Sequence, residues 1–578
     1  MIFAVWGEGN GARDVWDRLR TDLGRPRAFG ALEGGFLGAW GHGCLEGTRA
    51  WLGHVEDSSA PLEHLRGTYA LVEAAPRGFF LASGALGGRP LFWARSRGVH
   101  LACTSLEKLV AALTALGERP AVNATGLARS VVFLGAPERV PYVGVERVRT
   151  LRILQVGPGF RTERMRHTPA WSDHPLEATE AATRLFDAVG ASVARAVGDR
   201  QRVAVMAGGG VDSSALLAAT LAQARGATPK EITALTWDFG GDGDDRPYMR
   251  DLENALGIVP IRVSPAGATP SFARSLVVEG APYTLLCGAM ELQTFALAKE
   301  RGCEMVLTGI GGDEVLAGAV QAAVLGGAVT GRGLRRLGAI PGAVRRAVTL
   351  DVSTARTPLR RIGDFLVRPL LRPLASRRLR TRNFVRRMRS TTPWLGPLGD
   401  AALEAAARET TAETRVPADA RSRYLHFADR TLFEEYMDLR ALLEEESGLP
   451  RADVYLDDAL VELVARIPPE HLVFGGRHRG LFREGLRGHV PESIRLRKSK
   501  ASFDDAIQGY AASLEARTLV RSLGTGAVAA DLGIADRRLL AEAATRIASE
   551  RDPAAYGLGL SYLWSTLAAE AFLREQRP

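Results

Sequence analysis

The 578-residue chain is poor in cysteine and lysine and has no long uncharged apolar run of membrane-spanning character. Its cysteines are Cys44, Cys103, Cys287 and Cys303. They are scattered and form no CxxC pair, which argues against a disulfide framework, a zinc ribbon and a redox dithiol. Apolar residues make up 46% and charged residues 24%, as in ordinary globular proteins, so a disordered chain and a multi-pass membrane protein are excluded. The first ten residues contain no basic region, so we expect no signal peptide and a cytoplasmic location.

Lysine is the rarest charged residue, with five copies against 69 arginines. Two of the five, Lys498 and Lys500, stand together in the sequence Arg497-Lys-Ser-Lys. Lysine is a compact point charge whereas arginine is a planar fork, so a site can require one and not the other. We interpret the pair as a candidate site, with chance placement as the alternative. No Gly-Lys dipeptide occurs in the chain, which excludes a Walker A loop.

The net charge of +9 is unevenly distributed. Residues 331–390 contain 17 arginines, no lysine and two acids, Asp351 and Asp364, so this segment carries +15 and the rest of the chain −6. The segment is either a solvated helical insert or a surface for an acidic peptide, a phosphate-rich ligand or RNA. The sequence pI is about 9.6, but because the remainder of the chain is acidic, this value does not predict nucleic-acid binding by the whole chain. We expect neither a nucleic-acid nor a membrane partner.

Two regions with different patterns follow one another along the chain. The pattern of residues 1–170 predicts a β-rich region of short strands between glycine-rich turns. Strands are expected at 69–72, 79–82 and 90–94. A linker is expected around residues 171–175. From residue 176 helices and strands alternate, as is typical of a parallel α/β sheet. The expected helices are 181–197, 213–224 and 248–256, and the expected strands are 202–206, 232–237 and 258–263. Beyond residue 400 we expect most segments to be helical, and the uncharged run 315–331 is interpreted as one buried helix.

The strongest local signal is the sequence Val203-Ala-Val-Met-Ala-Gly-Gly-Gly-Val-Asp-Ser-Ser214. A hydrophobic strand is followed by three glycines, and a helix is expected to begin near Asp212. Glycines let backbone N–H groups approach an anion closely, and the helix N-terminus adds unpaired donors and a favourable dipole. The sequence therefore predicts a phosphate-binding loop.

A second loop, Val306-Leu-Thr-Gly-Ile-Gly-Gly-Asp-Glu314, carries Asp313 after another apolar strand. Carboxylates on two loops, Asp212 and Asp313, are suited to hold Mg²⁺ on a pyrophosphate. Acidic residues at a helix start also stabilise the helix without any metal. Considered with the first loop, the metal interpretation is favoured.

Together the two loops resemble those of the asparagine-synthetase-like ATP pyrophosphatases, whose motifs read S-G-G-x-D-S-S and G-x-G-G/A-D-E. Further matching segments begin at Gly87, Tyr455, Arg497 and Leu563. The resemblance implies a fold of the α/β class. It consists of an α+β, β-rich glutaminase-like domain at 1–170 and an ATP-dependent synthetase domain at 171–578, which has a parallel sheet and a helical C-terminal part.

The resemblance also implies the chemistry: ATP adenylates a carboxylate with Mg²⁺, pyrophosphate leaves, and an amine attacks. Lys500 matches the family's catalytic lysine. The positions implied for ATP and pyrophosphate binding are Ala207, Gly209, Gly210, Asp212, Ser213, Ser214, Thr236, Gly309 and Lys498. Mg²⁺ would be bound by Asp212 and Asp313.

Departures from the family pattern reduce the number of family activities that fit this chain. Glutamine-dependent members use a cysteine at position 2, where this chain has Ile2, so we expect no glutaminase reaction. Ile310, Pro450 and Gly208 replace a glutamate, a glutamate and a serine of the pattern, so asparagine synthesis loses support. Two subfamilies without the cysteine are similar: β-lactam synthetases and lasso-peptide macrolactam synthetases.

The arginine-rich segment favours a leader-free peptide substrate and hence a lasso-peptide cyclase, with a leader peptidase and a leader-recognition protein as further partners. In a β-lactam synthetase a Tyr–Glu pair deprotonates the amine. Tyr436 with Glu445 or Glu446 could serve in this way, although these residues also fit an ordinary amphipathic helix. A tRNA-modifying pyrophosphatase and an inactive peptide-binding scaffold are the rival classes.

Overall fold

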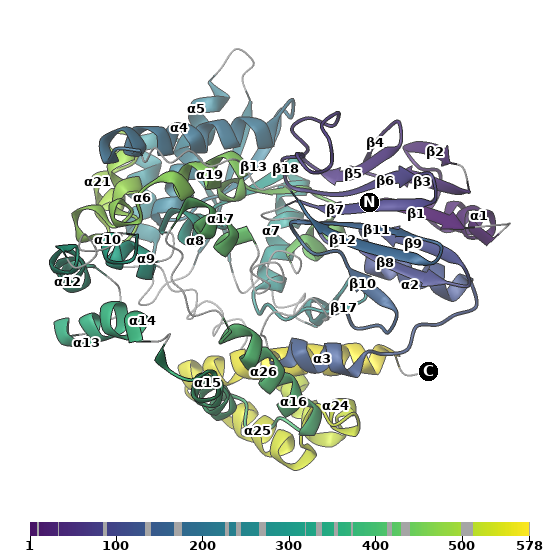
Figure 1. Cartoon of the computed structure of the whole chain (residues 1–578). Helices are drawn as coiled ribbons and strands as arrows, with labels where there is room; N and C mark the ends of the chain where they lie inside the picture. Colours follow the sequence, from purple (N-terminus) through teal and green to yellow (C-terminus); the bar gives the residue numbers. More distant parts are fainter. Residues whose placement is uncertain are drawn as a thin grey trace.

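The computed structural model shows two antiparallel sheets on one side of the molecule and a parallel sheet with helices on the other (Figure 1). The structure describes residues 1–7, 11–32, 34–84, 89–132, 140–166, 176–225, 230–238, 244–264, 273–317, 320–330, 338–351, 357–371, 374–412, 419–428, 440–498 and 513–576. The segment expected to act as a linker, residues 171–175, lies outside these ranges.

Twelve strands from the first 165 residues form the two antiparallel sheets. The first sheet contains, in spatial order, β10 (Val145–Arg147), β8 (Phe92–Ser96), β9 (Val99–Cys103), β1 (Ile2–Gly7), β3 (Gly35–Ala39) and β2 (Ala28–Leu32). The second contains β12 (Phe160–Met165), β11 (Arg152–Gly157), β7 (Gly78–Ser83), β6 (Tyr69–Ala75), β5 (Arg49–Gly53) and β4 (Cys44–Glu46). The expected strands at 69–72, 79–82 and 90–94 correspond to β6, β7 and β8.

The two sheets pack face to face through apolar side chains on their facing sides. Ile2 and Ala4 of β1 share one buried cluster with Val72 of β6 and Phe79 of β7. The opposite face of the first sheet is covered by α1 (Gly11–Leu23) and α2 (Leu106–Ala115). Ile2 is fully buried, so position 2 contributes to the core of the sandwich.

The second half of the fold is built on a five-stranded, all-parallel sheet. Its order is β15 (Ile261–Val263), β14 (Glu231–Trp237), β13 (Arg202–Met206), β18 (Met305–Thr308) and β19 (Arg451–Asp453). The strands expected at 202–206 and 232–237 are confirmed. The strand expected at 258–263 is shorter, because Pro260 has no N–H to donate to a ladder and pairing begins only at Ile261.

Helices cover both faces of this sheet, so its central strands β13 and β18 are nearly continuous runs of apolar residues. The expected helices are α4 (Ala178–Val197), α5 (Val211–Ala224) and α6 (Arg246–Leu256). α4 and α5 pack with α19 (Asp458–Arg466) against Val203 and Val205. On the other face α7 (Gly288–Glu300) packs against Ala204 and Val306.

The uncharged run 315–331 does not form the single helix expected. It contains the end of α8 (Gly312–Ala317), then α9 (Val320–Leu325) and α10 (Gly327–Thr330). Gly326, with φ +48°, interrupts the run between α9 and α10; a left-handed backbone cannot continue an α-helix. No helix in the described part of the chain is long and apolar enough to cross a membrane.

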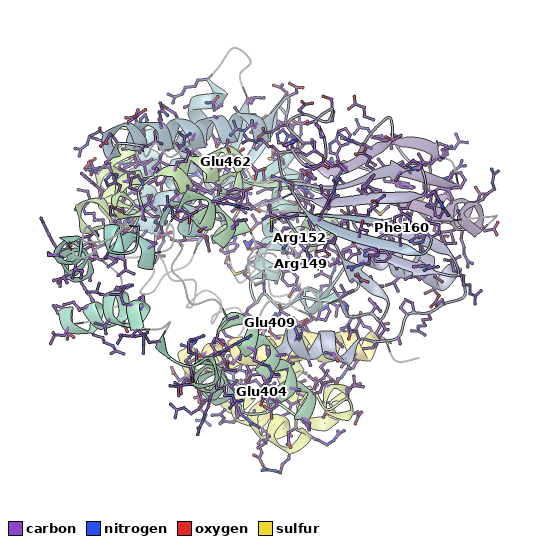
Figure 2. All side chains as sticks on the ribbon, viewed as in Figure 1. Arg149, Arg152, Phe160, Glu404, Glu409 and Glu462 are labelled. Carbon is purple, nitrogen blue, oxygen red and sulfur yellow. The ribbon has the colours of Figure 1, made fainter. Side chains whose placement is uncertain are left out.

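A helical layer completes the fold, consistent with the expectation for residues beyond 400. It consists of α3 (Ala124–Val131), α16 (Pro397–Thr410), α23 (Leu514–Ser522), α24 (Val528–Asp531), α25 (Arg537–Ser549) and α26 (Pro553–Gln576). α3 comes from the N-terminal region, and Arg129 on it pairs with Glu409 of α16 at 3.2 Å (Glu409 is labelled in Figure 2).

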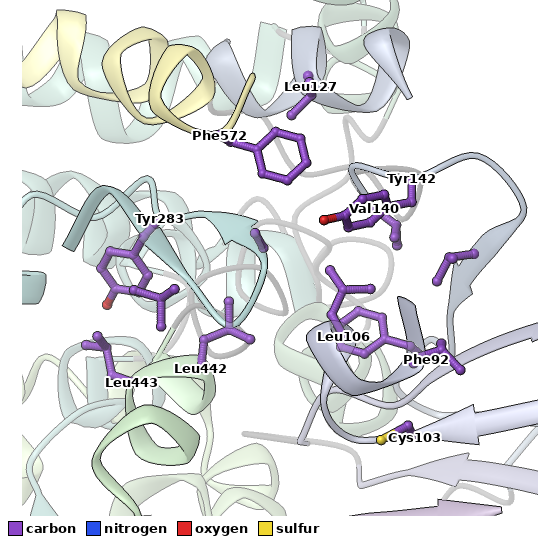
Figure 3. Close-up of a cluster of buried hydrophobic side chains, with 14 of the residues drawn as sticks. Phe92, Cys103, Leu106, Leu127, Val140, Tyr142, Tyr283, Leu442, Leu443 and Phe572 are labelled. Carbon is purple, nitrogen blue, oxygen red and sulfur yellow. The ribbon is translucent and has the colours of Figure 1, made fainter. Parts of the chain in front are cut away.

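The β-sandwich and the parallel-sheet region share one buried core. Phe92 and Leu106 of the sandwich belong to the same apolar cluster as Tyr283 and Phe572, and Figure 3 shows these side chains converging from the two regions. Ion pairs also cross the junction: Arg89 with Glu444 at 2.5 Å, Arg166 with Asp458 at 3.5 Å, and Arg66 with Glu462 at 2.5 Å (Glu462 is labelled in Figure 2). The sandwich is therefore a fixed support for the second region.

Another contact across this junction involves Glu279, a carboxyl group with a raised pKa. Glu279 (φ +49°) and Gly280 form the tight turn between β16 (Val277–Val278) and β17 (Ala281–Pro282). The hydroxyl of Ser105, the N-cap of α2, donates to Glu279 Oε2 at 2.6 Å. Burial raises the pKa of Glu279 to about 7, although the hydrogen bond from Ser105 acts in the opposite direction.

This pKa predicts that the protein loses stability as the pH rises toward 7. The folded carboxyl holds its proton at pH values where the unfolded chain has released it, so its contribution is present at low pH and is lost on ionisation. Between about pH 5 and about pH 8 the free energy of unfolding of Glu279→Gln should fall by about 2–3 kcal/mol less than that of the wild type. Urea unfolding at both pH values measures this, with Glu404→Gln, at an exposed glutamate of α16, as control. Parallel pH dependences would contradict the prediction.

Candidate active site at the carboxyl edge of the parallel sheet

The strand order of the parallel sheet defines where a ligand would bind. From β13 the chain continues to β14 on one side, whereas β18 lies on the other side, so the sheet changes winding direction between β13 and β18. In open α/β sheets such a switch point leaves a crevice at the carboxyl ends of the strands. The two glycine-rich loops follow β13 and β18 at this edge.

The first loop is held in shape by the serines of α5. Both hydroxyls, of Ser213 and Ser214, donate to the carbonyl oxygen of Gly208 at 3.0 Å, and Ser214 is fully buried. Gly210 is the N-cap of α5, so the next N–H groups have no intrahelical acceptor. The loop and the helix therefore present backbone donors at one point, the arrangement expected of an anion-binding site.

The second loop packs so closely on the first that glycine is required. A Cβ added to Gly312 would lie 2.6 Å from Cγ of Asp212. This contact brings the two sequence-predicted carboxylates, Asp212 and Asp313, to the same place. Tyr455, which is fully buried, fixes Asp212 from below by donating its hydroxyl to the Asp212 carbonyl oxygen at 2.8 Å.

A buried arginine joins the two carboxylates. Arg479 Nη1 contacts Asp212 Oδ2 and lies 3.1 Å from Asp313 Oδ1. Arg479 is 8% exposed and has φ +57°, an uncommon conformation for a residue with a side chain. Left-handed non-glycine residues of this kind are concentrated at functional sites. Arg479 precedes α20 (Gly480–Gly485) and is the main residue here that sequence reasoning missed.

The site is suited to a divalent cation. Burial raises the pKa of Asp212; Arg479 opposes this and the charge of Asp313 adds to it. Asp212 Oδ1 is buried without a hydrogen-bond partner, which is unfavourable unless a ligand satisfies it. No group of three or more His, Cys, Asp or Glu side chains that could hold a metal occurs in the described ranges. Two carboxylates are nevertheless what Mg²⁺ commonly takes from a protein when phosphate oxygens and water supply the other ligands.

Cationic side chains lie near the two loops. Burial, together with the like charge of Arg479, lowers the pKa of Arg483 to about 10. Arg497 is 6% exposed, and its Nη1 donates to the carbonyl oxygen of Gly209 at 2.8 Å. Lys498 follows directly and is exposed. A cluster of this kind attracts a polyanion such as a triphosphate.

The remaining predicted positions fall at the same edge or outside the described residues. Ala207 extends the pairing of β13 with β14 by donating to the Leu235 carbonyl oxygen at 2.7 Å, next to Thr236, and Gly309 follows β18. These three backbone positions thus lie along one edge. Lys500 and Tyr436 are outside the described residues.

The glutamates considered as partners of Tyr436 do not lie at this edge. Arg440 pairs with Glu291 near the start of α7, whereas Lys299 at its end donates to the Ser447 carbonyl oxygen. The segment 440–447 therefore runs along α7 away from the carboxyl edge, which places Glu445 and Glu446 toward the opposite end. Glu446 pairs with Arg274, and Glu445 lies 4.0 Å from the N-terminal nitrogen. Both fit the structural role that was the alternative.

The glycine loop between β13 and α5, the second loop with its carboxylate and the switch-point location are together the arrangement expected of an α/β site for a nucleotide phosphate and a divalent cation. The family model of asparagine synthase matches residues 184–574. The chain belongs to the asparagine synthase family, and its general activity is accordingly ATP-dependent formation of a carbon–nitrogen bond, with Mg²⁺ as the usual metal of the family.

Two solved structures show weak similarity to the chain. An allosteric regulatory enzyme of purine biosynthesis is 11% identical, with a TM-score of 0.19, and the match covers 53% of this chain and 79% of that chain. The glutamine phosphoribosylpyrophosphate amidotransferase of B. subtilis, complexed with ADP and GMP, is 10% identical, with a TM-score of 0.19 and coverages of 53% and 81%. Neither similarity is strong enough to support an inference. No curated protein matches the chain.

Proposed function

We propose that the protein is a lasso-peptide cyclase. It would adenylate an aspartate or glutamate side chain of a leader-free precursor peptide and close a macrolactam with the peptide's N-terminal amine, releasing AMP and pyrophosphate. The observation that carries the adenylation is that Asp212, at the end of the phosphate-binding loop, and Asp313, after the second loop, both contact Arg479. The proposal that the substrate is a peptide, and not a small molecule, is supported by the arginine-rich segment of residues 331–390.

In the proposed reaction the residues of the chain have separate tasks. Gly209 and Gly210 bind the pyrophosphate part of ATP through backbone N–H groups, with Ser213 and Ser214 fixing the loop. Asp212 and Asp313 would hold Mg²⁺, which neutralises charge on the departing pyrophosphate. Ala207, Thr236 and Gly309 frame the adenosine. Lys498 binds phosphate, and Lys500 stabilises the negative charge that develops when the amine attacks the activated carboxylate.

Support for a peptide substrate comes from the arginine-rich segment. α12 (Ile340–Thr349) ends beside the site: Asp351 donates its N–H to the Gly476 carbonyl oxygen at 2.7 Å, three residues before Arg479. Helices α13 (Pro358–Ile362), α14 (Arg368–Leu371) and α15 (Arg377–Thr391) follow at the periphery of the molecule (Figure 1). None of the α15 residues is buried and none is acidic. An extended basic surface suits an acidic peptide better than a small amino acid.

The helix α15 offers a direct test of this support. Arg378, Arg382 and Arg386 are exposed and spaced by four residues, so they form one stripe on the helix. Replacing all three by glutamine should weaken peptide binding by about tenfold at low salt, with less effect at high salt, and leave ATP binding unchanged. Glutamine at Arg537, Arg538 and Arg546 of α25, which are also exposed, is the matched control. Equal peptide affinity in both variants would contradict a role for the stripe.

Mass spectrometry with simultaneous AMP quantification tests the proposed function. The protein is incubated with ATP, Mg²⁺ and candidate leader-free peptides, with and without a leader peptidase and a leader-recognition protein. Loss of one water from a peptide together with release of AMP is the expected result. AMP release with turnover of a small β-amino acid instead would identify a β-lactam synthetase. Absence of AMP in every mixture would favour a peptide-binding scaffold.

A further inference from the structure

A carboxylate of the protein already occupies the phosphate-binding loop. Asp245 Oδ2 accepts the N–H of Gly209 at 2.9 Å, and Gly209 is at the centre of the three-glycine loop. Asp245 is the N-cap residue of α6, but its side chain caps no N–H of that helix. Its carboxylate is therefore directed away from its own helix and toward the loop.

The same carboxylate is paired with the cation of the loop. Arg497 Nη1 lies 2.5 Å from Asp245 Oδ1, and the Arg497 guanidinium stacks over the Tyr248 ring at 3.8 Å. The Arg497 side chain is 3% exposed and that of Asp245 is 14% exposed. An arginine in such surroundings needs an anion, because an unpaired charge is costly to bury. Asp245 supplies that anion when no nucleotide is bound.

The loop has room for this carboxylate because it lacks side chains. A Cβ on Gly208 would lie 3.4 Å from Asp245 Oδ2, and one on Gly209 would lie 3.2 Å from Asp245 Cγ and 2.7 Å from Tyr248 Cβ. Carboxylate and phosphate oxygens accept the same N–H and guanidinium donors. One backbone donor cannot be fully used by both, so the two anions compete for Gly209 and Arg497.

We propose that Asp245 is an internal competitor of the nucleotide: it occupies the Gly209 N–H and Arg497 in the nucleotide-free protein, and the pyrophosphate part of ATP binds by displacing it. The inference rests on the proposed use of ATP. It assigns two roles that the motifs did not indicate. Asp245 sets the nucleotide affinity, and Arg497 exchanges its carboxylate partner for a phosphate.

The test is calorimetric titration of the full-length protein with inorganic pyrophosphate, ATP·Mg²⁺ and AMP. Asp245→Asn removes the competing charge and leaves Arg497 seeking an anion, so pyrophosphate and ATP should bind about tenfold more tightly. AMP, which lacks the pyrophosphate, should bind as it does to the wild type. Asp244→Asn is the matched control, because Asp244 is one residue away and pairs with Arg246.

The sign of the effect separates competition from simple support of the loop. If Asp245 only supported the loop, its loss would weaken binding; unchanged or weaker binding in Asp245→Asn, or equally tighter binding in Asp244→Asn, would overturn the proposal. A wild type that binds neither ATP nor pyrophosphate would instead contradict the proposed function itself.

Loss of Asp245 alone leaves Arg497 without its carboxylate, so the folded state of that variant needs checking by thermal unfolding. The double variant Asp245→Asn/Arg497→Gln removes both charges and can replace it. Compared with Arg497→Gln alone, the double variant should bind pyrophosphate several-fold more tightly, because only the single variant retains the competitor. Equal affinity of these two variants would also overturn the proposal.

Discussion

Replacement of Asp212 by asparagine is expected to lower the rate of ATP-dependent AMP release by about 10³-fold, since a metal contributes several kcal/mol of charge stabilisation in such reactions. Asparagine has nearly the same shape as aspartate. The Tyr455 hydroxyl would still donate to the backbone carbonyl oxygen of residue 212, and Arg479 would still face Asp313. The loss would therefore report the charge of the carboxylate rather than the shape of the loop.

The pH dependence of the wild type provides a second readout of the same residue. Burial raises the pKa of Asp212, and only the ionised carboxylate binds Mg²⁺ well. Lowering the pH should therefore weaken Mg²⁺-dependent ATP binding at a higher pH than for an ordinary aspartate. In Asp212→Asn this pH dependence should disappear.

Two companion variants make the Asp212 result interpretable. Asp313→Asn removes the second carboxylate, whose side chain is more exposed (36% against 14%), so we expect a smaller loss that high Mg²⁺ partly restores. Asp244→Asn should have no effect on AMP release. AMP release by Asp212→Asn at the wild-type rate, with unchanged Mg²⁺ dependence, would remove Asp212 from the reaction.

The two loops of the site could be predicted because short-range physics determines them. Three glycines between an apolar strand and a helix start leave few alternatives to a phosphate-binding loop, and Asp212 and Asp313 each follow an apolar strand. The close contact of Gly312 with Asp212 is the spatial consequence. The sequence predicted that Asp212 and Asp313 act together on one metal ion, and the strand order places both loops at the switch point.

Arg479 and Asp245 could not be predicted, because no local pattern distinguishes them. Arg479 is one of 69 arginines, and it reaches Asp212 across 267 residues of sequence. In the sequence Asp245 has the pattern of an ordinary helix-cap residue. Only the fold brings its carboxylate to the N–H of Gly209. The wrong prediction of a single helix over 315–331 has a similar origin: hydrophobicity indicated burial correctly, but Gly326 interrupts the helix.

The second large effect is expected for Lys500→Ala. Amide formation should fall by about 10³-fold, because a positioned cation that stabilises developing charge contributes several powers of ten. The affinity for ATP should change little. Lys500 itself lies outside the described residues, but Arg497, three residues earlier, is anchored to the Gly209 carbonyl oxygen at 2.8 Å. Arg497, a described residue of the same sequence motif, is therefore held at the phosphate-binding loop.

Lys498→Ala is the matched control, since it removes the same charge two residues away. If Lys498 binds phosphate, its loss should weaken ATP binding by about tenfold and leave the single-turnover rate from bound ATP nearly intact. The two variants should thus separate binding from the chemical step. They are compared on the substrate that loses water in the mass-spectrometric assay, with ATP affinity measured in parallel.

Lys500→Arg tests whether the site requires lysine or only a positive charge, since almost all other basic residues of this chain are arginines. If charge alone were needed, arginine should restore most of the activity. We expect it to restore little, since a broad planar guanidinium cannot take the position of a compact ammonium group beside a tetrahedral centre. Retained cyclisation in Lys500→Ala would refute the catalytic role. Full activity in Lys500→Arg would instead mean that the lysine pair at 498 and 500 reflects chance and not the geometry of the reaction.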